Sequence, residues 1–549
     1  MQKRHVLRVG SLGGFLLLLS FLALSLKPVN AGLLNIKLSD PLQPHTQLGN
    51  IQISPNGQYA LFVADIITED AFELYSVPID GSEAPTLLSG GLLPAGAEVE
   101  AYHITPDSSR VVYIADQDSA DVMELYSVSI TGGPITKLNP PITASDGEVD
   151  SGTATFSPDG SRVVFLAEWQ TNNIYELFSV PVAGGTPVRL NGDLPMNGNL
   201  AGFEITPDGS SVVYLASQDS AWEYELYIVP LTGGDSVKLN DPLVAGGNVW
   251  TMKLSPDGSH VVYTAVQDVA NQWEIFSVAL TDPPAAPVKL NPPLGVNSDV
   301  IYDNFRISPD GNRVVYLADQ LLNDVYLFYS VPIEGGTAVQ LTNLVSGAPV
   351  LGGAHTFEIS PDSSRLVFRS KLADTFELFS VPLTGGPVTK LNGPIIPESG
   401  DVLEFQISPN SSRVVYLAIQ QVANSRELYS VPIGGGPADK LNSALPASGN
   451  VLVFQISENS QRVVYIADQQ IHNMYEIFSV PLTDGDITKL NPPLVDGGQV
   501  YLYLQISPNN NHVIYIAEQE TEDLSELFVT YEESPANPSH MVFMPFVKK

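Results

Sequence analysis

The chain has 549 residues, of which 44% are hydrophobic and 15% charged, a composition typical of a globular protein and not of a disordered one. Its formal net charge of −35 disfavours nucleic acid and anionic membrane surfaces as partners, because both carry charge of the same sign. The sequence contains no cysteine, which excludes disulfides, thiolate metal sites and a cysteine nucleophile.

Residues 1–31 are predicted to be a signal peptide. Lys3, Arg4 and Arg8 form a basic segment, residues 12–26 are apolar, and Val29 and Ala31 fit the small-residue cleavage positions. An uncleaved anchor is the alternative, although the apolar run is short for a membrane span. We therefore expect an exported protein (periplasmic, cell-surface or secreted) with no stable membrane span after cleavage.

Residues 32–531 are predicted to form ten repeats of about fifty residues. A Ser/Thr-Pro step recurs every 48 to 53 residues from Pro55 to Pro508, and Glu458 occupies the one position where the proline is missing. A period of this length is typical of repeat architectures, whose units must be interpreted together.

Each repeat contains four short β-like segments. In the second repeat these are residues 101–105, 110–115, 124–130 and 135–139, separated or ended by proline and glycine turns. No segment has a sustained 3.6-residue period, so helix is not expected. Four antiparallel strands per repeat predict an all-β fold, a β-propeller of about ten four-stranded blades.

The amino-acid sequence of the repeat resembles the WD40-like repeats of TolB-type propellers, in which a Ser-Pro-Asp-Gly turn joins the first two strands. That turn is complete at residues 157–160, 255–258 and 308–311, and the resemblance covers roughly residues 33–531. It implies the propeller fold and suggests envelope protein complexes as partners. It does not specify a function, because propellers serve many roles.

The two ends of the repeat array predict how the ring closes. Residues 37–42 (KLSDPL) nearly copy residues 238–243 (KLNDPL), whereas the tenth repeat stops without its own fourth strand. We expect the N-terminal strand to complete the tenth blade and remove an exposed edge. Two tandem five-bladed propellers fit the same phase, but no linker near residues 250–300 favours them over one ring.

A glutamate recurs just before the apolar pair of the third strand in nine repeats. Its recurrence indicates a structural hydrogen bond, to neighbouring backbone or to the arginine that recurs at the start of the second strand, such as Arg110. The nine residues are Glu73, Glu124, Glu176, Glu225, Glu274, Glu377, Glu427, Glu476 and Glu526.

The most variable position lies in the first strand, three residues before the Ser/Thr-Pro marker. In a propeller the first strand of each blade lies nearest the axis. These side chains are therefore predicted to line the channel as a polar ring. Within it, Lys253 and Arg306 form a cationic sector between Glu204 and Glu358. A binding site and a merely solvated or salt-bridged lining are both open interpretations. The predicted ring is Gln52, His103, Thr155, Glu204, Lys253, Arg306, Glu358, Gln406, Gln455 and Gln505.

No catalytic residue, metal site or cofactor is predicted. The sequence has no G-x-S-x-G elbow, HExxH motif or P-loop, and His103 and His355 stand isolated on different first strands. We expect a monomeric, non-enzymatic binding or scaffold propeller for protein, peptide or glycan. The alternative is an extracytoplasmic carbohydrate-active lyase or hydrolase that uses the channel-lining residues.

Residues 532–549 form a Pro/Ser/Asn linker followed by an apolar and then basic tail. A sorting signal and a loosely packed end are the two interpretations of this segment.

Overall fold

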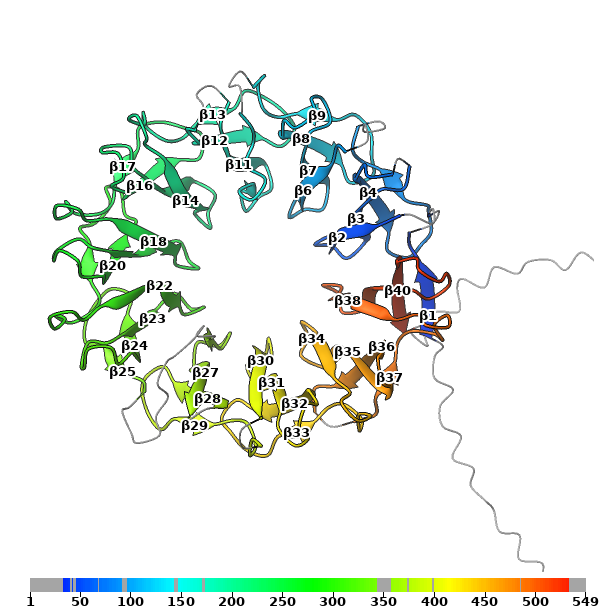
Figure 1. Cartoon of the computed structure of the whole chain (residues 1–549). Helices are drawn as coiled ribbons and strands as arrows, with labels where there is room; N and C mark the ends of the chain where they lie inside the picture. Colours follow the sequence, from blue (N-terminus) through cyan, green and yellow to red (C-terminus); the bar gives the residue numbers. More distant parts are fainter. Residues whose placement is uncertain are drawn as a thin grey trace, which may run out of the picture. The chain divides into compact units, whose positions relative to one another are not determined.

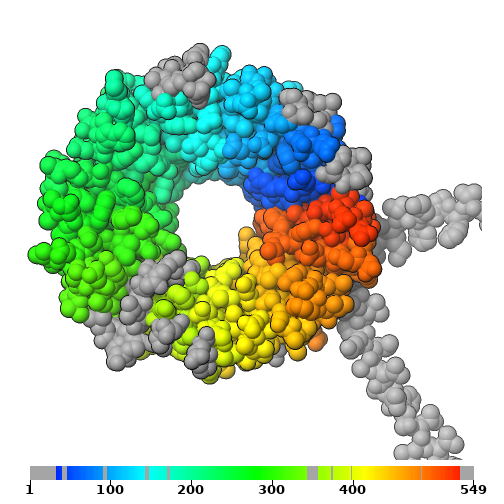
Figure 2. Space-filling model, viewed as in Figure 1, coloured from blue at the N-terminus to red at the C-terminus, as the bar shows by residue number. Residues whose placement is uncertain are grey.

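The computed structural model describes residues 33–532 apart from 40–41, 43–45, 68, 91–95, 143–146, 170–172, 343–356, 373–374, 397–398 and 484. The predicted signal peptide, the C-terminal tail and His355 lie outside the described residues. Asn35–Tyr531 form one compact unit. Within it, ten four-stranded antiparallel sheets are arranged as blades around a central opening (Figures 1 and 2).

The first strand of each blade lies nearest the opening (Figure 1). These strands are β2 (Leu48–Ile53), β6 (Val99–Ile104), β10 (Thr155–Phe156), β14 (Leu200–Ile205), β18 (Val249–Leu254), β22 (Val300–Ile307), β26 (Phe357–Ile359), β30 (Asp401–Ile407), β34 (Val451–Ile456) and β38 (Val500–Ile506).

The second and third strands are the buried centre of each blade. The second strands are β3 (Tyr59–Ala64), β7 (Arg110–Ala115), β11 (Arg162–Ala167), β15 (Ser211–Ala216), β19 (His260–Ala265), β23 (Arg313–Ala318), β27 (Arg365–Leu372), β31 (Arg413–Ile419), β35 (Arg462–Ile471) and β39 (His512–Ala517). The third strands are β4 (Glu73–Pro78), β8 (Glu124–Ser129), β12 (Glu176–Pro181), β16 (Glu225–Pro230), β20 (Glu274–Ala279), β24 (Leu327–Pro332), β28 (Thr375–Pro382), β32 (Glu427–Pro432), β36 (Met474–Pro481) and β40 (Glu526–Glu532).

The fourth strands are short and lie at the outer rim (Figure 1). They are β5 (Thr86–Leu87), β9 (Thr136–Lys137), β13 (Val188–Arg189), β17 (Val237–Lys238), β21 (Val288–Lys289), β25 (Val339–Gln340), β29 (Thr389–Lys390), β33 (Asp439–Lys440), β37 (Thr488–Lys489) and, for the tenth blade, β1 (Leu33–Lys37). The prediction of ten four-stranded blades in a single ring is therefore confirmed, and the two-ring alternative is not observed.

The hydrophobic core is divided among the interfaces between neighbouring blades. One cluster joins Leu61 and Leu74 of the first blade to Val111 and Tyr126 of the second, all fully buried. Similar clusters follow around the ring, including one that joins the tenth blade to the first. Because the middle of each second strand is buried on both faces, its residues there are mostly apolar instead of alternating, as in Val111–Ala115.

The recurring glutamate pairs with a cation on the fourth strand. Lys137 Nζ lies 2.5 Å from Glu124 Oε1, and the Tyr126 hydroxyl donates to Glu124 Oε2 at 3.0 Å. Equivalent Lys–Glu or Arg–Glu pairs occur in blades 2–5 and 7–10. The structural role predicted for these glutamates is confirmed, but in eight blades the cationic partner is the fourth-strand lysine or arginine and not the second-strand arginine.

The second-strand arginine binds a serine of the third strand instead. Arg110 Nε donates to Ser127 Oγ at 2.9 Å, and four further blades repeat this bond. Where histidine replaces the arginine in blade 5, the buried Oγ atom of Ser277 has no hydrogen-bond partner within the described ranges. The two recurring charges of the repeat therefore stabilise two different strand pairs.

The N-terminal strand closes the ring as predicted. Leu38 N donates to Leu527 O at 2.8 Å, and Leu527 N donates to Ser39 Oγ at 3.0 Å. Lys37 Nζ lies 2.6 Å from Glu526 Oε1, so the tenth blade has the same ion pair as the others. The described part of the chain has no helix with the length and hydropathy needed to cross a bilayer.

Candidate functional site on the channel wall

All ten predicted ring residues lie on the innermost strand of their blades. Thr155 and Arg306 are exposed, and the other eight are half-buried. The half-burial has a structural reason, because most of these side chains extend sideways to the next blade and not only toward the opening. The ten residues occupy equivalent positions on the first strands, but their side chains make different contacts.

Six of the ten side chains bridge neighbouring blades. Gln406 donates from Nε2 to Phe454 O at 3.2 Å and accepts from Ile456 N at 3.4 Å, so its amide pairs with the next inner strand as a peptide group would. The acceptor half of this bridge recurs at Gln455, Gln505, Glu204 and Glu358, and the donor half at Gln52. These residues satisfy backbone groups that the short innermost strands leave unpaired.

The two ring glutamates are half-buried acceptors. Burial raises the pKa of Glu204, against a hydrogen bond from Leu254 N and the charge of Lys253. Burial likewise raises the pKa of Glu358, opposed by a hydrogen bond from Ile407 N and by Arg306. Each glutamate is therefore held next to one of the two cations of the predicted sector, and each already uses an oxygen on the neighbouring blade.

Arg306, one of the two cations of that sector, contacts the next blade through an aromatic ring. The Arg306 guanidinium lies 5.1 Å from the centroid of the Phe357 ring on the next blade and donates to Phe305 O at 3.0 Å. A cation at that distance from an aromatic face is attracted by the ring quadrupole. Arg306 therefore also joins two blades, by a cation–π contact instead of an amide bridge.

A hollow opens where two successive positions, His103 and Thr155, have no bridging glutamine or glutamate. It is lined by three successive ring positions, Gln52, His103 and Thr155, together with apolar groups that include Phe156, and its volume is 370 Å³. The strand of the third blade at this point, β10, has only two residues. The wall is open here because an imidazole and a threonine cannot reach the next strand with an acceptor as a glutamine does.

His103 is the chemically distinctive group of this hollow. Its Nε2 atom is buried and has no hydrogen-bond partner among the described residues, and its ring meets the Phe156 ring edge-on with centroids 6.5 Å apart. Burial lowers the pKa of His103, so the imidazole is neutral near pH 7. A buried polar atom without a partner costs free energy unless a ligand or water satisfies it. On this wall, a hydrogen bond from a ligand or a water would therefore be most favourable at His103 Nε2.

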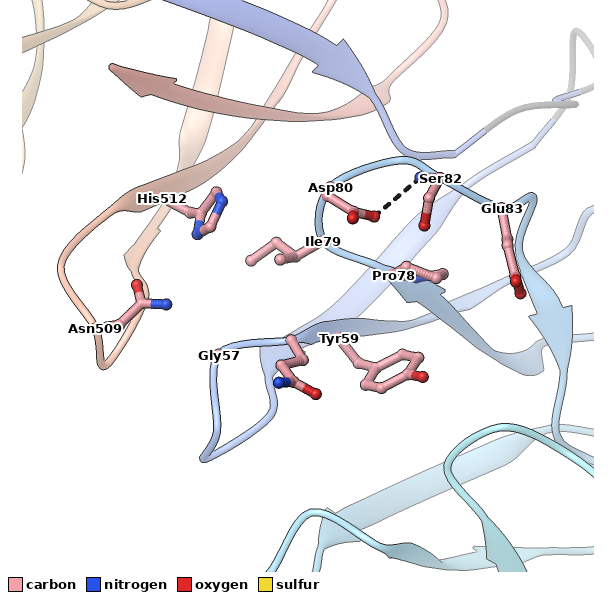
Figure 3. A pocket seen from close by; sticks show the side chains of 10 residues that line it. Gly57, Tyr59, Pro78, Ile79, Asp80, Ser82, Glu83, Asn509 and His512 are labelled. Atoms are coloured by element: carbon pink, nitrogen blue, oxygen red, sulfur yellow. Dashed lines mark hydrogen bonds between the residues drawn. The ribbon is translucent and has the colours of Figure 1, made fainter. Parts of the chain in front are cut away.

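A second hollow, of 410 Å³, lies on the seam between the first and tenth blades (Figure 3). Asn509 and His512 of the tenth blade face Tyr59 and Asp80 of the first. His512 stands where other blades have arginine, and burial lowers the pKa of its imidazole while the charge of Asp80 opposes that shift. This hollow contains none of the predicted ring residues.

The described residues contain no group of three or more His, Asp or Glu side chains placed to hold a metal ion. His103 has no second histidine in its hollow, and His355 lies outside the described residues. The sequence did not predict the apolar lining of the hollow. An apolar residue recurs at the position of Phe156 in every repeat, so it was interpreted as part of the common blade structure.

The fold and its repeats define the class of the protein, a β-propeller built from sequence repeats. This is the fold that the resemblance to WD40-like, TolB-type repeats predicted. No known family profile matches the sequence, and no curated protein matches it. Among solved structures, the chain is similar to a protein of Agrobacterium tumefaciens described as a TolB, with 18% identity, a TM-score of 0.27, and coverage of 43% of this chain and 77% of that one. It is also similar to prolyl oligopeptidase B from Galerina marginata, with 12% identity, a TM-score of 0.38, and coverage of 68% of this chain and 55% of the peptidase.

Proposed function

We propose that this protein is an exported, non-enzymatic binding propeller that holds an uncharged polar ligand, a peptide segment of a partner protein or a glycan, in the hollow at Gln52, His103 and Thr155. The observation that carries the proposal is the open hollow, whose lining includes His103 with a buried Nε2 atom that has no hydrogen-bond partner among the described residues. Export rests on the predicted signal peptide, and the periplasm, the cell surface and the medium are all compatible with it.

The lining of the hollow favours an uncharged ligand. Apart from neutral His103 it contains no ionisable side chain, and its polar groups are an amide, an imidazole and a hydroxyl. Such groups form hydrogen bonds with peptide backbone or sugar hydroxyls, and Phe156 with its apolar neighbours supplies contact area. A charged ligand would lose its hydration here without gaining a counter-charge.

Binding can be tested by calorimetry on the mature chain, residues 32–549. The probes are capped peptides without charged residues and neutral glucose and N-acetylglucosamine oligosaccharides. We expect one probe class to bind and His103→Ala to weaken that binding about tenfold, the loss of one well-placed hydrogen bond in a dry site. His260→Ala, in the arginine position of another blade, is the matched control and leaves affinity unchanged.

Two outcomes would count against the proposal. Equal affinity of the His103→Ala protein and the unaltered protein would remove the hollow as the binding site. Release of shortened oligosaccharides during incubation, detected by mass spectrometry, would favour the carbohydrate-active enzyme over the binding propeller.

A further inference from the structure

Three of the four tryptophans of the chain gather on one face of neighbouring blades. Trp222 lies in the loop between β15 and β16, Trp250 is the second residue of β18, and Trp273 directly precedes β20. Tyr302 of β22 joins them, with ring centroids 5.3 Å from Trp250 and 5.2 Å from Trp273. We call these four residues the aromatic patch; it spans blades 4 to 6 on the face that carries the loops between second and third strands.

Hydrogen bonds connect the parts of the patch. Asn248 Nδ2 donates to Trp222 O at 3.3 Å, and Asn248 Oδ1 accepts from Tyr224 N, which places the Trp222 loop beside the start of β18. At the other end, β22 slips register against β23 between Val300 and Phe305. A bulge of this kind turns side chains out of the sheet, here Tyr302 and Asp303.

The patch is open to solvent. Trp222 is 70% exposed, Trp250 53% and Tyr302 37%. Further exposed apolar side chains lie in the same loops and in the preceding connections: Met196, Val269, Val296, Leu321 and Leu322. Clustered, exposed aromatic side chains indicate an interaction site, because tryptophan and tyrosine dominate the energetics of such sites.

Trp222 occupies a backbone position that suits it poorly. Its φ is 73°, and at the equivalent loop position eight other blades have asparagine or aspartate with φ between 58° and 64°. Asparagine and aspartate tolerate this left-handed conformation, whereas a bulky side chain is strained there. The tryptophan therefore has a local cost with no packing gain, since its side chain is mostly in water.

The patch has an uncompensated negative rim. Glu223, Asp303 and Asp324 form no ion pair within the described part of the chain, whereas Asp219 and Asp268 in the same loops are paired with Lys238 and Lys289. A chain of hydrogen bonds ties this rim to the aromatics, because Asp299 accepts from Trp273 N, and Asp319 accepts from Asp299 N and Asp324 N.

We propose that the aromatic patch docks a basic, arginine- or lysine-containing segment of a partner polypeptide. Cationic side chains stack on tryptophan and tyrosine faces and pair with nearby carboxylates, so aromatic groups with an unpaired acidic rim match this chemistry. A second copy of this chain, with net charge −35, is repelled from the same face. The inference is independent of the hollow at His103, which favours uncharged groups.

The test uses the mature propeller and a capped peptide of alternating glycine and arginine, followed by tryptophan fluorescence and calorimetry. We expect the peptide to bind, the affinity to fall as salt rises, and the matched glycine–glutamine peptide not to bind. Trp222→Asn supplies the residue type of the other blades, so it removes the aromatic ring without disturbing the loop. It and Trp250→Ala should each weaken binding about tenfold.

The controls separate this site from the rest of the ring. Val422→Ala and Ile471→Ala remove exposed apolar side chains from blades 8 and 9 and leave affinity unchanged, as does His103→Ala. Failure of the arginine peptide to bind, or equal binding to Trp222→Asn, would overturn the proposal. Tryptophan-dependent binding of a neutral oligosaccharide in place of the peptide would overturn it in favour of a glycan.

Discussion

Along the inner wall, the reach and the hydrogen-bonding atoms of one side chain determine whether a position joins two blades. Glutamine offers both a donor and an acceptor at the right distance, and Gln406 uses both on the next strand. Glutamate supplies only the acceptor, as Glu204 does to Leu254 N at 2.7 Å. His103 has no such partner, and the wall opens beside it.

His103→Gln is therefore expected to stabilise the fold while removing the nitrogen that we propose contacts the ligand. An amide at this position can make the bridge found at Gln52 and Gln406, worth about 1 kcal/mol of unfolding free energy. The gain should also depend on pH. Burial lowers the pKa of His103 in the folded chain, so the unfolded chain takes up the proton more readily.

The sign follows from that difference in proton uptake. In the unaltered protein, the contribution of His103 to the free energy of unfolding falls as the pH drops through the unfolded histidine pKa of about 6.5. Above that pH this contribution stays constant. Denaturant unfolding at pH 7.5, 6.5 and 5.5 should show the advantage of His103→Gln widening as the pH falls. His512 is present in both proteins and cancels; stability curves that stay parallel would contradict the assignment.

At the scale of strands, blade 6 lacks both members of the recurring ion pair, whereas blade 1 keeps Glu73 although Leu87 occupies the lysine position. Blade 6 has Leu327 where nine blades have glutamate, and on its fourth strand Gln340 stands where most have lysine. In the part of the chain that the structure describes, the buried Tyr329 hydroxyl has no hydrogen-bond partner, whereas Tyr429 in blade 8 donates to Glu427 at 2.6 Å. Loss of the acid is thus accompanied by loss of the cation.

Lys440→Gln alone should destabilise blade 8, because it leaves the buried Glu427 carboxylate without its cation. We expect a loss of roughly 1–3 kcal/mol in unfolding free energy, less than for a fully buried pair because the Lys440 side chain is 29% exposed. Adding Glu427→Leu reproduces the pair of blade 6 and should recover stability to within about 1 kcal/mol of the unaltered protein.

Chemical denaturation of the two single variants and the double variant measures this coupling. Additive losses, with the double variant least stable of all, would show that the ion pair is not the link between the third and fourth strands.

The strands, their order and the closure of the ring could be predicted from the sequence, because each depends on residues that recur at a fixed period. The Glu–Lys pairing was harder to predict, because Leu327 and Gln340 change together in blade 6 but blade 1 keeps Glu73 with Leu87 at the lysine position. The channel wall was harder to predict. The spacing places Gln406 and His103 on equivalent positions, but only the distance to the next blade shows that one bridges and the other does not. The tryptophan gathering was visible as three of four tryptophans within blades 4 and 5.

For the whole molecule, one ring of ten blades depends on a seam between the two ends of the array. Across it Gln505 accepts from Ile53 N at 3.0 Å, and the Tyr503 hydroxyl donates to Ile51 O at 2.6 Å. The N-terminal strand adds the outer part of the seam, where Leu38 is buried and Asn35 bonds Tyr515. The blades of the middle of the ring need no such strand from elsewhere in the chain.

Deletion of residues 32–39 should therefore destabilise the ring and expose a sheet edge. Burial of Leu38 alone contributes about 1.5–3 kcal/mol, and Glu526 would lose Lys37 while Leu527 N would lose Ser39 Oγ. We expect a lower thermal midpoint and new dimers or aggregates in size-exclusion chromatography, because β40 would present an unpaired edge. The control chain begins at residue 32, without the predicted signal peptide, and should stay monomeric. Adding a peptide of residues 35–42 in trans should restore the melting midpoint, and a peptide carrying Leu38→Asp should not. An unchanged midpoint after the deletion would show that the inner-strand bonds of Gln505 and Tyr503 close the ring by themselves.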